Sequence, residues 1–354
     1  MAAVTLAGLV GILAPACSSS SGDSAATCDG KTGEKEKAAT YGEGTPPDGA
    51  GKKVGMVFDV GGRGDKGFND SAYNGLTAAA EDMKVDAKYL EPDAQGSNRG
   101  ELMRSLADDG YPMVIGVGFA FADDMEKIAK DYPDVKFAII DGVVDLPNVT
   151  SLVFAEEQGS YLMGAAAAQA TEAKRVGFIG GVESELIKKF QAGYDAGVQK
   201  VDPDVEIDNK YITPEGDFTG FKDPAKGETI AKGLYADGND VVYHAAGLSG
   251  TGVFKAAAAE DRLVIGVDND QYFQVPADQQ KCMLSSMTKR VDVAIYDAVS
   301  SYVDGSLKTG VQVGDLKSGG IDFATAGGQI PDTEQLEDLK QQIIDGKIKV
   351  PTTP

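Results

Sequence analysis

Short, continuously apolar runs alternate along the chain with longer stretches whose apolar residues recur at helical spacing. The apolar runs cover residues 54–60, 113–117, 137–140, 176–179, 241–243 and 263–267. The amphipathic stretches cover residues 71–83, 99–108, 122–131, 160–171, 188–201 and 225–236. Strands that are apolar on both faces and alternate with helices are typical of βαβ units on a mainly parallel sheet.

A single doubly wound domain seldom contains so many strands and helices, so the pattern predicts two lobes. Chain crossings between the lobes are expected near residues 141–151, 284–289 and 319–321. We therefore predict an α/β protein with two lobes, each a mainly parallel sheet flanked by helices, joined by a hinge of crossing strands. The first lobe is expected to take residues 52–150 and 286–320, and the second lobe residues 151–285 and 321–354.

The start of the chain has the pattern of an export signal. Residues 5–16 are apolar, as long as a signal-peptide core and too short to span a bilayer as a helix. Small residues then lead to Cys17 and a Ser/Gly tract, which resembles a bacterial lipobox, although no Lys or Arg precedes the apolar run. We predict a signal peptide over 1–16, a lipid anchor at Cys17 and a flexible linker to residue 51, the alternative being a buried N-terminal helix.

The composition narrows the class of function. With 33 Lys and Arg against 55 Asp and Glu, the chain carries a net charge of −22, which disfavours binding to nucleic acid or to anionic lipid head groups. Its one histidine, His244, excludes His-rich metal sites and catalysis by several histidines. We accordingly expect no metal site and no cofactor.

Two cysteines remain if Cys17 is acylated. In the oxidising environment outside the cytoplasm, Cys28 and Cys282 could form a disulfide that closes a very long loop. The alternative is two unrelated thiols, one of them in the linker. The sequence leaves both open.

A dinucleotide-binding fingerprint is the first enzyme motif to weigh. Gly62, Gly64 and Gly67 follow a strand with the spacing G-x-G-x-x-G, and Glu91 comes at the end of the next strand. Asp65 stands in the loop where a pyrophosphate would have to approach, which is electrostatically unfavourable. The glycines are better explained as a sharp turn that lets the backbone approach a ligand.

A nucleophile elbow is the second enzyme motif to consider. Residues 247–252 read GLSGTG, but the motif G-x-S-x-G around Ser249 needs a glycine at the position that Thr251 occupies. His244 comes five residues before Ser249, whereas the hydrolase order puts the histidine much later. A Gly-rich turn from strand to helix explains the segment better, and we expect no enzyme.

Aromatic and charged residues gather where strands end, at the sheet edge where α/β proteins bind ligands. Phe68, Phe119 and Phe221 stand at such positions. They are accompanied by Asp59, Asp123, Asp268 and Lys289. Rings together with hydrogen-bonding charges suit a flat ligand that carries hydroxyl groups.

Several segments in order resemble the basic membrane protein family, the lipoprotein substrate-binding proteins of ABC-type nucleoside importers. They are VFDVGG (57–62), GDKGFND (64–70), VGFAFAD (117–123), EEQGSYLMG (156–164), KFQAGY (189–194), FKDPAKG (221–227), GVDNDQ (266–271), SMTKRVD (286–292) and IIDGKIKVP (343–351). The resemblance covers residues 52–351 and implies a two-lobed periplasmic-binding-protein type I fold.

The resemblance also implies roles for single residues. Phe68 and Phe221 would sandwich a purine base, with Phe190 as a competitor for the second position. The other expected ligand-binding residues are Asp59, Asn69, Asp123 and Phe119 around the base or sugar edges, Gly247 for close backbone approach, and Asp268 and Lys289 for the ribose hydroxyls. Arg63 has no assigned role.

The expected function is therefore capture of a purine nucleoside and its delivery to the permease subunits of an ABC transporter. The protein would be a monomer outside the cytoplasm, held at the cell membrane by Cys17. The alternative is a binding or sensor protein of the same fold for a sugar or an autoinducer-like ligand. Because acids outnumber bases among the expected site residues, we predict that nucleosides bind better than nucleotides.

Overall fold

The structure is a computed structural model that describes Met1, residues 25–42 and residues 44–354. Cys17 and the predicted signal peptide after Met1 lie outside the described residues. Among the described residues, no helix combines the length and the apolar character needed to cross a membrane.

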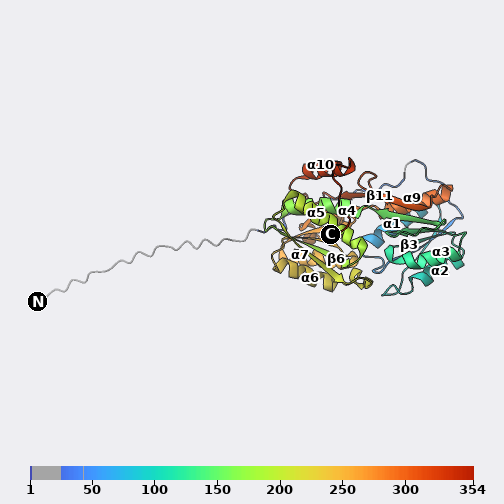
Figure 1. Cartoon of the computed structure of the whole chain (residues 1–354), viewed down its shortest axis with the longest axis horizontal. Coiled ribbons are helices and arrows are strands. Elements are labelled where there is room, and N and C mark those ends of the chain that lie inside the picture. The colour runs from blue at the N-terminus through green and yellow to red at the C-terminus, as the bar shows by residue number, and fades with distance from the viewer. Residues whose placement is uncertain (2–24, 43) are drawn as a thin grey trace.

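Two six-stranded sheets, each covered by helices, form two lobes that lie side by side (Figure 1). The first lobe has the strand order β11-β5-β4-β3-β1-β2. Its strands are β1 (Lys53–Val57), β2 (Asp86–Leu90), β3 (Met113–Val117), β4 (Lys136–Ile140), β5 (Val149–Phe154) and β11 (Gly310–Gly314). Its helices are α1 (Phe68–Met83), α2 (Arg99–Asp108), α3 (Ala122–Asp131) and α9 (Val291–Asp304), with the 3-10 turn η1 (Phe119–Phe121).

The second lobe has the strand order β12-β10-β9-β8-β6-β7. Its strands are β6 (Arg175–Val182), β7 (Glu206–Thr213), β8 (Val241–Ala245), β9 (Leu263–Asp268), β10 (Met283–Lys289) and β12 (Ile321–Phe323). Its helices are α4 (Glu156–Ala170), α5 (Glu185–Val201), α6 (Pro224–Ala236), α7 (Gly250–Glu260), α8 (Ala277–Gln280) and α10 (Thr333–Ile344), with the 3-10 turns η2 (Phe218–Phe221), η3 (Gly247–Ser249) and η4 (Gln271–Gln274).

Nearly all strand pairs are parallel, and β12 pairs antiparallel with β10. The central strands β1, β3, β8 and β9 are buried almost throughout, as their uninterrupted apolar sequences require. The predicted two-lobed, mainly parallel α/β architecture is thus confirmed.

Small residues let helix α4 lie directly against helix α5. A Cβ on Gly164 would stand 2.0 Å from the carbonyl oxygen of Tyr194, and a Cβ on Gly197 would stand 2.0 Å from that of Tyr161. Such distances are far inside van der Waals contact, so only glycine fits at these two positions. This explains why α4 carries apolar and small residues all around its surface.

The chain passes between the sheets three times. It leaves the first sheet after β5, returns from β10 to α9, and crosses again between β11 and β12. The expected lobe limits after residues 150 and 285 fall inside strands. Strand β5 runs past the first limit and still belongs to the first sheet, and β10 runs past the second limit and still belongs to the second sheet. Those limits stay predictions, because membership of a sheet does not by itself fix the border of a lobe.

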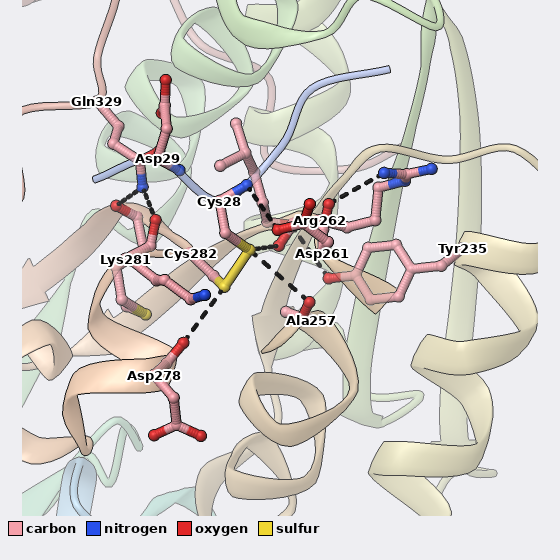
Figure 2. The surroundings of a disulfide bond; sticks show 12 residues. Cys28, Asp29, Tyr235, Ala257, Asp261, Arg262, Asp278, Lys281, Cys282 and Gln329 are labelled. Carbon is pink, nitrogen blue, oxygen red and sulfur yellow. Dashed lines mark hydrogen bonds between the residues drawn. A yellow bond between two sulfur atoms is a disulfide. The ribbon is translucent and has the colours of Figure 1, made fainter. Parts of the chain in front are cut away.

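The segment before β1 is fastened to the second lobe (Figure 2). Cys28 and Cys282 form a disulfide, one of the two alternatives that the sequence left open. The backbone N–H of Ala26 donates to the Asp240 carboxylate at 2.9 Å, and the N–H of Gly30 donates to the Lys281 carbonyl at 2.9 Å. This part of the expected linker therefore has fixed contacts with the lobe.

Candidate functional site

A cleft of about 550 Å³, a volume that includes space open to solvent, lies between the two lobes. Both lobes line it. The first lobe contributes Asp59, Val60, Asp65, Phe68, Asn69, Gly118, Phe119 and Asp141, and the second contributes Leu186, Ile187, Phe190, Phe221, Ala245, Gly247, Val267, Asp268 and Lys289.

The fold brings these residues together because the carboxyl ends of the parallel strands of both sheets face the cleft. Asp59, Gly118 and Asp141 follow β1, β3 and β4 in the first lobe. Asp268 and Lys289 are the last residues of β9 and β10 in the second lobe. The polar groups of the site thus stand at or just beyond the ends of strands of the two sheets.

The loop between β1 and α1 is organised by the Asp65 carboxylate. It accepts the backbone N–H groups of Gly67 at 3.0 Å, Asn69 at 2.8 Å and Asp70 at 3.1 Å. It also accepts the Asn69 side-chain amide at 3.0 Å. Asp65 therefore caps the first turn of α1 and holds Phe68 at the cleft wall.

Asn69 links this loop to Asp59. Its side-chain oxygen accepts the Asp59 backbone N–H at 3.0 Å, and Oδ1 of Asp59 accepts the N–H of Val60 at 2.7 Å. Burial raises the pKa of Asp59 and that of Asp65 to about 6 each. Asn69 accordingly fixes the position of a buried carboxyl that faces the cleft.

Lys289 forms the electrostatic centre of the site. Its Nζ donates to Oδ2 of Asp141 at 2.6 Å across the lobe boundary and stands 3.8 Å from carboxylate oxygens of Asp268 and Glu156. Burial alone would lower the pKa of Lys289, but the three carboxyl groups outweigh it and raise that pKa above its ordinary value. The lysine therefore stays charged.

The acids around Lys289 are held away from water. Burial raises the pKa of Asp268 to about 7 and that of Glu156 to about 8. Asp141 and Asp268 both have left-handed backbones, with φ of 62° and 68°. Non-glycine residues seldom adopt this conformation, and it occurs at two of the four acids that line the cleft.

The lobes touch each other at the Gly-rich loop. The side-chain amide of Asn269 donates to the Gly67 carbonyl at 3.1 Å, and that of Gln271 donates to the Lys66 carbonyl at 3.0 Å. Together with the pair of Lys289 and Asp141, these contacts hold the lobes closed over the cleft.

The structure brings most of the expected site residues to the cleft, namely Asp59, Phe68, Asn69, Phe119, Phe221, Gly247, Asp268 and Lys289. It does not bring Asp123, which is exposed in the first turn of α3 and does not line the cleft. Asp141 lies there instead. Its position directly after an apolar run was the signal that would have identified it.

Two further side chains have places that the sequence did not assign. Phe190 and Phe221 both line the cleft, so both candidates for the second ring lie there. The Arg63 guanidinium stands 3.5 Å from the ring centre of Tyr73 and 5.8 Å from that of Tyr89, and Arg63 does not line the cleft. Arg63 is thus a surface cation packed on aromatic rings.

Ser249 is committed to structural hydrogen bonds. Its hydroxyl donates to the Gly220 carbonyl at 2.7 Å and accepts the Asp223 N–H at 2.7 Å. His244 packs edge-on against Phe254, and burial lowers the pKa of its imidazole to about 3. Among the described residues, no group of His, Cys, Asp and Glu is placed to hold a metal ion.

Comparison with known proteins agrees with this architecture. Residues 52–353 match the Bmp family, described as "ABC transporter substrate-binding protein PnrA-like". The chain is similar to the "ABC transporter nucleoside-binding protein BmpA" of Lactococcus lactis subsp. cremoris, with 35% identity over 85% of this chain and 89% of that protein. It is also similar to the "CD4+ T-cell-stimulating antigen" of Listeria innocua, with 33% identity over 97% and 96% of the two chains.

Among solved structures, the chain is similar to an ABC transporter solute-binding protein from Aeropyrum pernix. The TM-score is 0.74 and the identity 29%, over 85% of this chain and 93% of the other. A protein from Conexibacter woesei that is described in the same terms, with a TM-score of 0.67 and 21% identity, shares the fold.

Proposed function

Because the chain belongs to the Bmp family of PnrA-like ABC transporter substrate-binding proteins, we propose that it captures a purine nucleoside and delivers it to a permease. Proteins of this kind act outside the cytoplasm and bind their substrates without converting them, so they are not enzymes. The family assignment gives the role of a substrate-binding protein, and the proposal names the substrate, a purine nucleoside. A Lactococcus relative named as nucleoside-binding supports it.

One observation carries the proposal: two aromatic rings from opposite lobes, Phe68 and Phe221, line the same cleft as a buried acid and lysine. Two rings suit the two faces of a purine. Asp268 and Lys289 suit the hydroxyl groups of a ribose, and Asp59 suits the N–H donors of a base edge. A sugar would use the polar groups and leave the rings with less to stack on.

The magnitudes are sufficient for capture at low concentration. Each base–aromatic stack contributes roughly 1–3 kcal/mol, and each hydrogen bond to a charged group roughly 1.5–3 kcal/mol. Two stacks and two or three such bonds allow a Kd of about 1 μM or tighter, near −8 kcal/mol, after the cost of ordering the ligand and lobes.

Charge favours nucleosides over nucleotides. The cleft is lined by the carboxyl groups of Asp59, Asp65, Asp141 and Asp268, and Lys289 is the one cation among its lining residues. A phosphate would meet mostly negative charge, so AMP should bind at least tenfold more weakly than adenosine. Equal or tighter binding of AMP in calorimetric titrations would refute this reasoning.

The ring pair is tested by Phe221→Ala. Losing one stack should weaken purine nucleoside binding by roughly 5–150-fold, which corresponds to about 1–3 kcal/mol. Phe273→Ala is the matched control, since Phe273 packs edge-on against Tyr272 and does not line the cleft. If Phe221→Ala binds nucleosides as the unmodified protein does, a sugar or an autoinducer-like ligand becomes the better assignment.

We also propose that Cys17 carries a lipid anchor and that the mature protein is a monomer at the cell membrane. Metabolic labelling with a palmitate analogue tests the anchor. Label should enter the membrane fraction with Cys17 and disappear with Cys17→Ala. Label that persists in this variant would refute the assignment.

A further inference from the structure

An aromatic contact joins the lobes through Phe218, a ring that does not itself line the cleft. Phe218, on η2 of the second lobe, has its ring centre 5.6 Å from that of Phe119 in the first lobe, at an interplanar angle of 59°. The Arg99 guanidinium of α2, also in the first lobe, lies 5.1 Å from the Phe218 ring centre. Phe218 therefore touches a ring and a cation of the opposite lobe.

Apart from aromatic rings, Arg99 interacts with the Asp59 carboxyl, whose pKa its charge lowers against the effect of burial. Its Nε and Nη1 atoms are buried without a hydrogen-bond partner among the described residues. Its guanidinium stands 5.7 Å from the Phe121 ring centre as well. An Arg held mainly by aromatic faces loses much of its environment when the Phe218 ring moves away.

The turn that carries Phe218 is rigidly attached to the second lobe. Asp217 accepts the Thr219 N–H at 3.1 Å, and the Thr213 hydroxyl donates to the Asp217 carbonyl at 2.5 Å. The Ser249 hydroxyl donates a hydrogen bond to the Gly220 carbonyl at 2.7 Å. Phe218 must therefore move with the second lobe when the cleft opens.

The same turn ends in Phe221, which does line the cleft. Phe119 connects the two rings, because its ring centre lies 6.4 Å from that of Phe221 in an edge-on arrangement. Seating Phe221 at the ligand and seating Phe218 at the opposite lobe are thus one movement of one rigid turn.

We infer that Phe218 is a closing latch: its contacts with Phe119 and Arg99 hold the lobes together and slow the escape of the bound ligand. The inference rests on the proposed function for the identity of that ligand, but not for the existence of the latch. Phe218 is a positioning residue, since it does not line the cleft and acts through closure.

The test measures the rate at which the protein releases a bound nucleoside. The chain has no Trp, so release is followed with tritiated adenosine or guanosine chased by excess unlabelled ligand. An aromatic pair and a half-buried cation–π contact together predict that Phe218→Ala releases the ligand about tenfold faster. Phe218→Leu keeps an apolar side chain, so its release rate should lie between those of the unmodified protein and Phe218→Ala.

Arg99→Ala should also speed release, and its effect should largely vanish in the Phe218→Ala background, because both changes break the same contact. Arg104→Ala is the control. Arg104 lies on the same helix, and its guanidinium stands 5.6 Å from the Tyr132 ring centre within the first lobe. Release rates of Phe218→Ala and Arg99→Ala within twofold of the unmodified protein would overturn the latch.

A second readout needs no ligand and is insensitive to folding stability alone. Small-angle X-ray scattering of the ligand-free protein should give a larger radius of gyration for Phe218→Ala than for the unmodified protein and Arg104→Ala. Unchanged scattering would overturn the latch. If no purine nucleoside binds the unmodified protein, the proposed function fails, and the scattering comparison still decides whether the latch exists.

Discussion

Glu156 should destabilise the folded protein at neutral pH, and Glu156→Gln should relieve this. The side chain is 1% exposed at the start of α4, and neither carboxyl oxygen has a hydrogen-bond partner among the described residues. Its nearest cations, Lys289 and Lys189, stand 3.8 Å and 3.9 Å away. Lys289 is already shared with Asp141 and Asp268.

The sign follows from the two states of the chain. Burial raises the pKa of Glu156 from its ordinary 4.5 to about 8 in the folded protein. Below pH 4.5 the carboxyl is protonated in both states. As the pH rises toward 8, the unfolded chain releases a proton that the folded chain retains, so stability falls. At pH 7 the accumulated loss is on the order of 3 kcal/mol.

Glu156→Gln keeps the shape and removes the titration. Urea unfolding of the ligand-free protein between pH 5 and pH 8 should therefore show the variant within about 1 kcal/mol of the unmodified protein at pH 5 and more stable by about 4 kcal/mol at pH 8. Glu157→Gln is the control, since Glu157 is the neighbouring acid on the same helix and is only half-buried. A variant that is no more stable than the unmodified protein at pH 8 would refute the reasoning, because Glu156 would then be a charged partner of Lys289.

Three further predictions follow from other contacts. Replacing Cys28 and Cys282 together by Ser should lower the free energy of unfolding by about 2–5 kcal/mol, and the difference from the unmodified protein should vanish in a reducing buffer. Ser249→Ala should cost about 1–3 kcal/mol, because it leaves the buried Gly220 carbonyl and Asp223 N–H without their partner; calorimetry showing no change in Tm would contradict this. Asp141→Asn should weaken nucleoside binding, whereas Asp123→Asn should leave the Kd unchanged, and titrations that give the reverse order would contradict the placement of these acids.

The periodicity of the sequence predicts the buried elements well and the edge elements poorly. Helices α2 and α3 and strand β3 have the predicted bounds, because a buried face imposes a regular apolar pattern. The edge strands β7 and β11 were missed, and β2 was recognised only by Glu91 at its end, since these strands are mostly exposed or half-exposed and their residues are largely polar. Strand β5 was assigned to a crossing because Pro147 and polar residues precede it.

The site shows the same division. The motif resemblance indicated residues such as Phe68 and Lys289, which local sequence marks clearly, and the structure places them in the cleft. Asp123 also lies in a matching segment, but the first turn of α3 directs it to solvent. Glu156 and Phe218 carried no signal, because their importance depends on neighbours more than a hundred residues away or across the lobe boundary.

The central claim is that the cleft between the lobes takes a purine nucleoside. Isothermal titration of unfolded and refolded, ligand-free protein tests it most directly, with adenosine, guanosine, uridine and a panel of pentoses and hexoses as titrants. The account predicts a Kd of about 1 μM or tighter for at least one purine nucleoside and no measurable heat with the free sugars. Binding of a free sugar together with no binding of any nucleoside would contradict it.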